Sequence, residues 1–170
     1  MTTMDNGLGS GSEAAMSDAA ANGAPSFAIG DGIVTTDIAG SVDIGYSMTV
    51  QADGGILIAG GTDNDFALVR YNADGSLDTS FGGGDGIVTT DIAGSFDQGY
   101  SVTVQADGDI LVAGRSGADF ALVRYNADGS LDTGFGGGDG IVTTDIAGSV
   151  DIGYSVTVQA DGDILVAGRS

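Results

Sequence analysis

The residues best able to do chemistry in this sequence are aspartates at turn-like positions. Oxygen-bearing side chains alternate around a glycine in the segment Asn72 to Asp78, which recurs at Asn126 to Asp132. Each of two glycine runs also contains one aspartate. Calcium takes six to eight hard oxygen ligands of this kind. The candidate metal ligands are therefore six aspartates: Asp74, Asp78, Asp85, Asp128, Asp132 and Asp139.

Known calcium motifs fit these segments poorly. With Gly75 at the sixth position of a helix-loop calcium motif, Arg70 falls at the first position, where a cation would repel the metal. The glycine runs resemble the repeats of calcium-binding β-rolls, but Val88 stands where an aspartate is required. Aspartate also forms turns by binding its own backbone, and this interpretation is favoured. Calcium is thus the one cofactor left open.

Other chemistries are limited by what the chain lacks. It has no histidine, cysteine or lysine, so the usual bases, thiol nucleophiles and zinc ligands are missing. No feature distinguishes one aspartate as a general acid. The net charge of −20 argues against binding to nucleic acid or anionic lipid, and no apolar run is long enough to span a membrane. We expect no enzymatic activity.

Two other sets of residues have both a structural and a binding interpretation. Arg70 and Arg124 are charged residues inside apolar segments, where the guanidinium is expected to reach an aspartate or backbone carbonyls. A clamp for a ligand carboxylate is the alternative. Tyr46, Tyr100 and Tyr154 each follow a glycine and could stack on sugars, although packing is the more common role for such tyrosines.

The chain is an internal repeat. Phe27, Phe81 and Phe135 open equivalent segments that are 54 residues apart. The organisation is therefore a flexible leader over residues 1–26, repeats over 27–80 and 81–134, and a truncated repeat over 135–170. The near-identity of the copies prevents their comparison from singling out functional residues.

Each repeat predicts four short β-strands and no helix. In the second copy the predicted strands are Ile87 to Ile92, Ser101 to Gln105, Asp109 to Gly114 and Phe120 to Tyr125. Asp107-Gly108 between the second and third predicts a tight hairpin. Four antiparallel strands per repeat indicate tandem blades of a partial β-propeller. A β-solenoid is the alternative all-β fold.

One pattern resembles a known family. The run from Asp65 to Gly82, DFALVRYNADGSLDTSFG, followed by VTVQADGDILVAG at Val102 to Gly114, is similar to the bacterial delta-60 repeat. The resemblance implies propeller-like tandem arrays in large surface or secreted bacterial proteins, without an agreed activity. The chain departs from the family pattern at Gly55, Asp109 and Asp163, where a lysine is usual.

The number of blades shapes the functional expectation. The predicted strands make fewer than three blades, whereas propellers close with about four to eight. We therefore expect a piece of a longer array or a chain that self-associates, with further repeats, a second copy, or a protein or glycan as partner. The leading function is a structural or interaction scaffold outside the bacterial cell. A calcium-stabilised module and a sugar-binding propeller are the alternatives.

Overall fold

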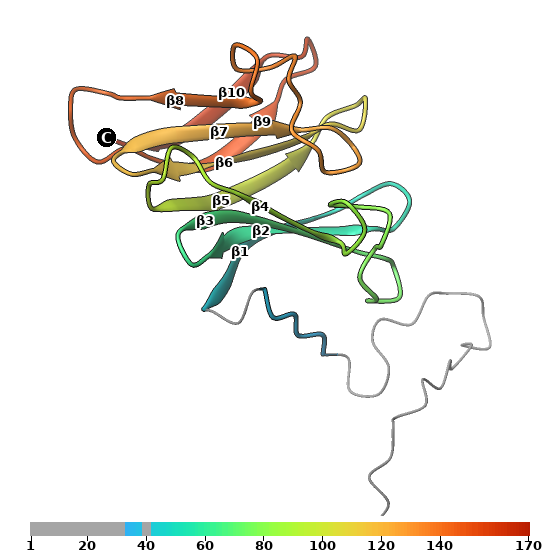
Figure 1. Ribbon diagram of the computed structural model, residues 1–170. Coiled ribbons are helices and arrows are strands. Elements are labelled where there is room, and N and C mark those ends of the chain that lie inside the picture. Colours follow the sequence, from blue (N-terminus) through green and yellow to red (C-terminus); the bar gives the residue numbers. More distant parts are fainter. Residues whose placement is uncertain (1–32, 39–41) are drawn as a thin grey trace, which may run out of the picture.

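The computed structural model describes residues 33–38 and 42–170, and within them every regular element is a β-strand. The predicted leader, residues 1–26, and the beginning of the first repeat lie outside the described residues. Ten strands in this described part form three separate antiparallel sheets, which stack as successive layers (Figure 1). We call these sheets the first, second and third blades.

Each full blade is a simple antiparallel meander, in which neighbours in sequence are neighbours in the sheet. The first blade contains β1 (Asp43–Val50), β2 (Ile56–Thr62), β3 (Asp65–Tyr71) and β4 (Ile87–Thr90). The second contains β5 (Asp97–Val104), β6 (Ile110–Ser116), β7 (Asp119–Tyr125) and β8 (Ile141–Thr144). The third contains β9 (Ile152–Val158) and β10 (Ile164–Arg169). This is the all-β architecture of tandem propeller blades, and the solenoid alternative is wrong.

Local sequence explains the hairpins. The predicted turn between β5 and β6 is confirmed: the Gln105 amide donates to Asp109 O at 2.8 Å, and Gly108 has a φ of 99°. That conformation is easily accessible only to glycine. The same turn recurs at Gly54 and Gly162, with φ of 90° and 94°. Asp-Gly therefore sets the register of the inner hairpin in all three blades.

The blades are out of phase with the sequence copies. β4 lies in the second sequence copy but pairs with β3 of the first blade, and β8 pairs with β7 in the same way. The predicted strand Ile87 to Ile92 ends earlier, at Thr90. The predicted strand at Ser101 begins earlier, at Asp97, because a β-bulge lets it continue through Gly99.

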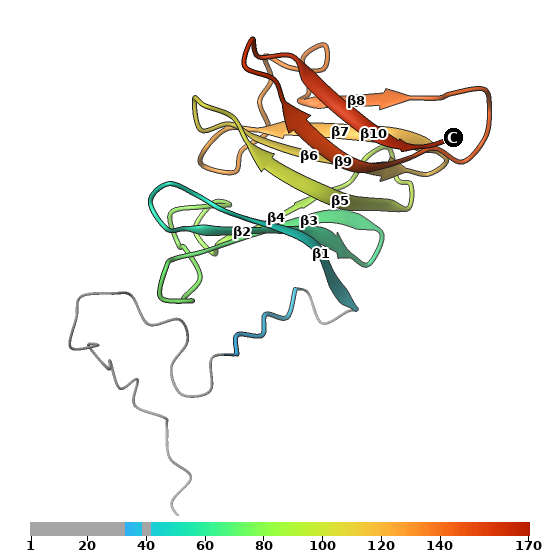
Figure 2. The ribbon, with the colours of Figure 1, turned by 180° about the vertical axis from the view of Figure 1, so that it is seen from behind.

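The core lies between the blades rather than within one sheet. Leu57, Ala59 and Leu68 of the first blade belong to one buried cluster with Ile110 and Val123 of the second. A smaller cluster joins the second blade to the third, and β5 lies between β1 and β9 in the stack (Figure 2). Each blade is thus stabilised by its neighbours. The described residues contain no helix that could cross a membrane.

Candidate functional site at the blade junctions

Neighbouring blades meet through a phenylalanine that enters a hollow lined by glycines. Phe66 on β3 is fully buried, and its ring reaches into the second blade. A Cβ atom added to Gly114 would lie 2.9 Å from Phe66 Cζ, and one added to Gly99 would lie 3.6 Å from Phe66 Cδ2. At the next junction, a Cβ on Gly168 would lie 2.6 Å from the Phe120 ring. The glycines therefore leave the space that the ring occupies.

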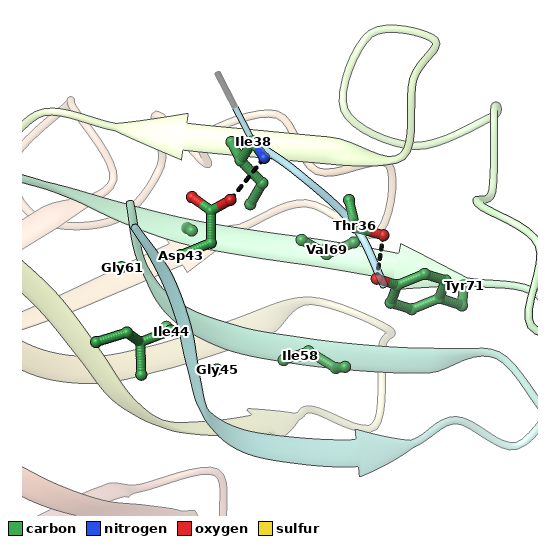
Figure 3. A pocket seen from close by; sticks show the side chains of 11 residues that line it. Thr36, Ile38, Asp43, Ile44, Gly45, Ile58, Gly61, Val69 and Tyr71 are labelled. Atoms are coloured by element: carbon green, nitrogen blue, oxygen red, sulfur yellow. Dashed lines mark hydrogen bonds between the residues drawn. The ribbon is translucent and has the colours of Figure 1, made fainter. Parts of the chain in front are cut away.

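The same hollow is present on the open face of the first blade. Gly45 and Gly60 occupy there the positions that Gly99 and Gly114 have in the second blade. The hollow has a volume of about 170 Å³, and none of the described side chains that line it is a phenylalanine (Figure 3). Tyr71 and its apolar neighbours on β2 and β3 form one wall. This face has the shape of half a blade junction.

Apolar residues that are buried at the inner junctions are exposed at the two end faces. Leu111 of the second blade is 0 % exposed, whereas Leu165, at the same position of the third blade, is 49 % exposed. On the other side, Val102 is 7 % exposed and its counterpart Met48 is 58 % exposed. The end faces therefore carry the residue positions that neighbouring blades cover inside the stack.

Hydrogen bonds hold the end of β4 against the second blade. Thr90 Oγ1 and Tyr125 OH lie 2.8 Å apart in a buried position, and burial raises the pKa of Tyr125, which keeps its hydroxyl protonated. The Ser116 hydroxyl donates to the carbonyl of Ile92 at 3.2 Å.

Residues 33–38 dock on the first blade in the same way. Thr36 Oγ1 lies 2.6 Å from Tyr71 OH (Figure 3), and the Thr62 hydroxyl donates to Ile38 O at 3.2 Å. These two contacts repeat, 54 residues earlier, those between the end of the first blade and the second. The segment therefore sits where the end of a preceding fourth strand would lie.

The three tyrosines form a row along the first strands of the blades. The ring centroids of Tyr46 and Tyr100 are 4.8 Å apart, and those of Tyr100 and Tyr154 are 5.7 Å apart. Each tyrosine is the extra residue of a β-bulge, which redirects its side chain. Tyr100 OH donates to Gln98 Oε1, whose Nε2 donates to Tyr46 OH at 3.3 Å. Because the rings pack against one another, the packing interpretation is confirmed, and sugar binding stays a prediction.

The six predicted metal ligands lie in turns that use their carboxylates. Asp74 Oδ1 accepts hydrogen bonds from the Ser76 hydroxyl and amide, at 2.7 Å and 3.0 Å, and these bonds lower the pKa of Asp74. Asp78 binds Ser80 in the same manner, and Asp85 accepts from the amide of Ile87. Their counterparts make equivalent local contacts: Asp128, Asp132 and Asp139. In the part of the chain that is described, no three of the six carboxylates come together. Metal binding by them stays a prediction.

The arginines act as the sequence predicts. Arg70 Nε donates to Asp78 Oδ2 at 2.7 Å, and the guanidinium lies 4.5 Å from the centre of the Phe81 ring. Its Nη1 donates to Ala127 O at 2.7 Å, which is a contact across the junction to the second blade. Arg124 makes the equivalent ion pair with Asp132 and the equivalent ring contact with Phe135. The expectation that these guanidinium groups reach an aspartate or backbone carbonyls is confirmed: both bind an aspartate, and Arg70 also binds a carbonyl.

Two clusters of aspartates were not expected from the sequence. We call them the junction triads: Asp65, Asp91 and Asp97 at the first junction, and Asp119, Asp145 and Asp151 at the second. In each triad, one carboxylate oxygen from every member lies within 4.8 Å of the others. The spacing of Asp91 and Asp97 around one loop recurs in every copy, and this repetition could have indicated two members of each triad. The third aspartate comes from a hairpin that only the folded stack brings near.

Comparison with protein families agrees with this architecture. Residues 51–81 and 105–135 match the family model described as "Domain of unknown function (DUF5122) beta-propeller". The two matches begin at equivalent positions of successive repeats and run from the inner hairpin to the turn after the third strand. No curated protein matches the chain. The chain therefore carries two copies of a propeller-like repeat.

Proposed function

We propose that this chain is a non-enzymatic repeat scaffold whose end faces pair with further blades of the same repeat. The observation that carries the proposal is the contrast between Leu111, buried at an inner junction, and its half-exposed counterpart Leu165. One sequence position meets a neighbouring blade in one case and solvent in the other. The resemblance to the delta-60 repeat, which occurs in tandem arrays, supports the same function.

The free energy of burial favours such pairing. Covering one large apolar side chain stabilises a contact by about 1.5–3 kcal/mol. The end face of the third blade exposes Leu165, and Val166 beside it is also exposed where no third strand covers it. β10 pairs with β9 alone, so its other edge is open for a further strand. The opposite face exposes Met48 and Val50 and contains the glycine hollow.

The test is to lengthen the array in phase. Residues 117–170, one full period, are appended after Ser170 so that the third blade gains its third and fourth strands. If blades stack as modules, each added interface contributes its own increment of stability. The free energy of unfolding should rise by about 3 kcal/mol or more, and the amides of β10 should become protected from hydrogen exchange.

The matched control appends the same 54 residues in scrambled order, so that length, composition and charge are equal. It should leave both the stability and the exchange of β10 unchanged. An in-phase extension that behaves like the scrambled one would refute the scaffold proposal, because the end face would then have no affinity for the next blade.

A further inference from the structure

The junction triads bring three carboxylates from two blades to one point. Asp65 begins β3 of the first blade, Asp91 follows β4, and Asp97 begins β5 of the second blade. The Asp97 amide donates to Asn64 O at 2.6 Å, and this bond places the start of β5 against the β2–β3 turn. The second triad is built in the same way, with the Asp151 amide donating to Ala118 O at 2.7 Å.

A buried oxygen in the first triad has no hydrogen-bond partner. Asp97 is 1 % exposed, and its Oδ2 accepts from the Ile92 amide at 2.6 Å. Its Oδ1 has no hydrogen-bond partner, and the Ser116 hydroxyl donates to the carbonyl of Ile92. In the second triad Asp151 is 0 % exposed, and its Oδ1 has only a 3.4 Å contact with Ser149. A buried carboxylate oxygen without a good hydrogen bond destabilises the fold.

No side-chain cation balances these carboxylates. In the described part of the chain, the salt bridges join Arg70 and Arg124 to Asp78, Asp109 and Asp132, and none reaches a triad. Burial and then the nearby Asp91 raise the pKa of Asp65, while burial raises the pKa of Asp97. The three carboxylates are therefore unfavourable in their charged form unless a cation binds between them.

We propose that each junction triad binds one divalent cation, with Ca²⁺ as the best fit. Carboxylate oxygens are hard ligands that suit Ca²⁺ or Mg²⁺, and calcium accepts irregular geometry. Two oxygens on opposite sides of a calcium ion are about 5 Å apart, which accommodates the 4.8 Å limit on the triad oxygens. Asp97 Oδ1 gains the partner that it lacks, and water completes the coordination. The ion bridges two blades.

The experiment titrates the full chain with CaCl₂ by isothermal calorimetry in about 0.15 M salt, which screens binding to the general negative charge. Two ions should bind per chain, with dissociation constants of about 0.1–1 mM, the range of sites in extracellular modules. Thermal melts should show a higher Tm with calcium than with chelator. Among the described residues, no three carboxylates come together at the open face, so a third full site is not expected.

Matched variants separate the triads from the predicted turn ligands. Asp65→Asn with Asp119→Asn removes one ligand from each triad and should weaken binding at least about tenfold. Asp85→Asn with Asp139→Asn removes the same charge from two turns and should bind as the parent does. If the first variant fails to fold, Asp91→Asn with Asp145→Asn changes exposed triad members instead. Absence of saturable binding, or equal loss in the turn variant, would overturn the proposal.

Discussion

Truncating the same phenylalanine at two repeat positions should have unequal costs. Phe66 and Phe120 occupy identical places in successive copies, and each ring enters the glycine hollow of the next blade. Phe66 belongs to a buried cluster that includes residues of β5, β6 and β7, whereas Phe120 faces a blade that contains β9 and β10 alone. Phe120 is therefore only partly buried. The difference in cost measures what a complete neighbouring blade contributes.

The magnitude follows from burial. Replacing a fully buried phenylalanine by alanine costs about 3–5 kcal/mol, from lost transfer free energy and the cavity that remains. Because Phe120 is partly exposed, its burial contributes less transfer free energy, and water can fill the space that its removal leaves. We expect Phe120→Ala to cost about 1–2 kcal/mol less than Phe66→Ala.

Urea unfolding followed by far-ultraviolet circular dichroism gives both free energies. If Phe66→Ala does not fold, Phe66→Leu and Phe120→Leu form a milder pair with the same expected order. Equal costs for the two positions would refute the reasoning, because burial between blades would then contribute nothing beyond the single sheet.

Three further predictions concern the junctions and the end faces. Tyr125→Phe leaves the buried Thr90 hydroxyl without its partner and should cost about 1–2 kcal/mol in the same unfolding assay, more than Tyr71→Phe at the open face. The pKa of Asp65 is raised in the fold, so its charge opposes folding above the unfolded value; Asp65→Asn should stabilise the metal-free chain at pH 7, and the gain should fade toward about pH 4 in urea melts across that range. Sedimentation equilibrium should show self-association that Leu165→Asp reduces while Thr79→Asp, which adds the same charge on a loop, does not; a parent chain that stays monomeric would contradict this.

Much of the fold could be predicted because the information is local. Short runs of strand-forming residues between glycine and aspartate turns predict strands, and the Asp-Gly pair at Gly108 predicts a hairpin. The phase of the blades was not predictable in this way. The composition of the segment at Ile87 does not indicate whether it pairs with the strand before it or the strand after it. Its pairing with β3 in the structure assigns it to the first blade. The early start of β5 was not predictable either, because it depends on the bulge at Tyr100.

The candidate site was less predictable, because its residues come from different blades. The turn aspartates such as Asp74 attracted a metal interpretation because they are close in sequence, yet closeness in sequence is also what lets a turn satisfy them. Asp65 and Asp97 are 32 residues apart and belong to different sheets. Their carboxylates come together only when the hairpin of one blade contacts the first strand of the next, which the sequence does not indicate.

The position of the triads links cation binding to stacking rather than to the folding of a single blade. A cation held by Asp65 and Asp97 binds only where two blades are already in contact, so its free energy of binding adds to the junction. Without the cation, the same carboxylates repel one another and oppose the contact that Phe66 stabilises. The balance between an apolar ring and a charged triad at each junction would then make the rigidity of the array depend on the cation concentration around it.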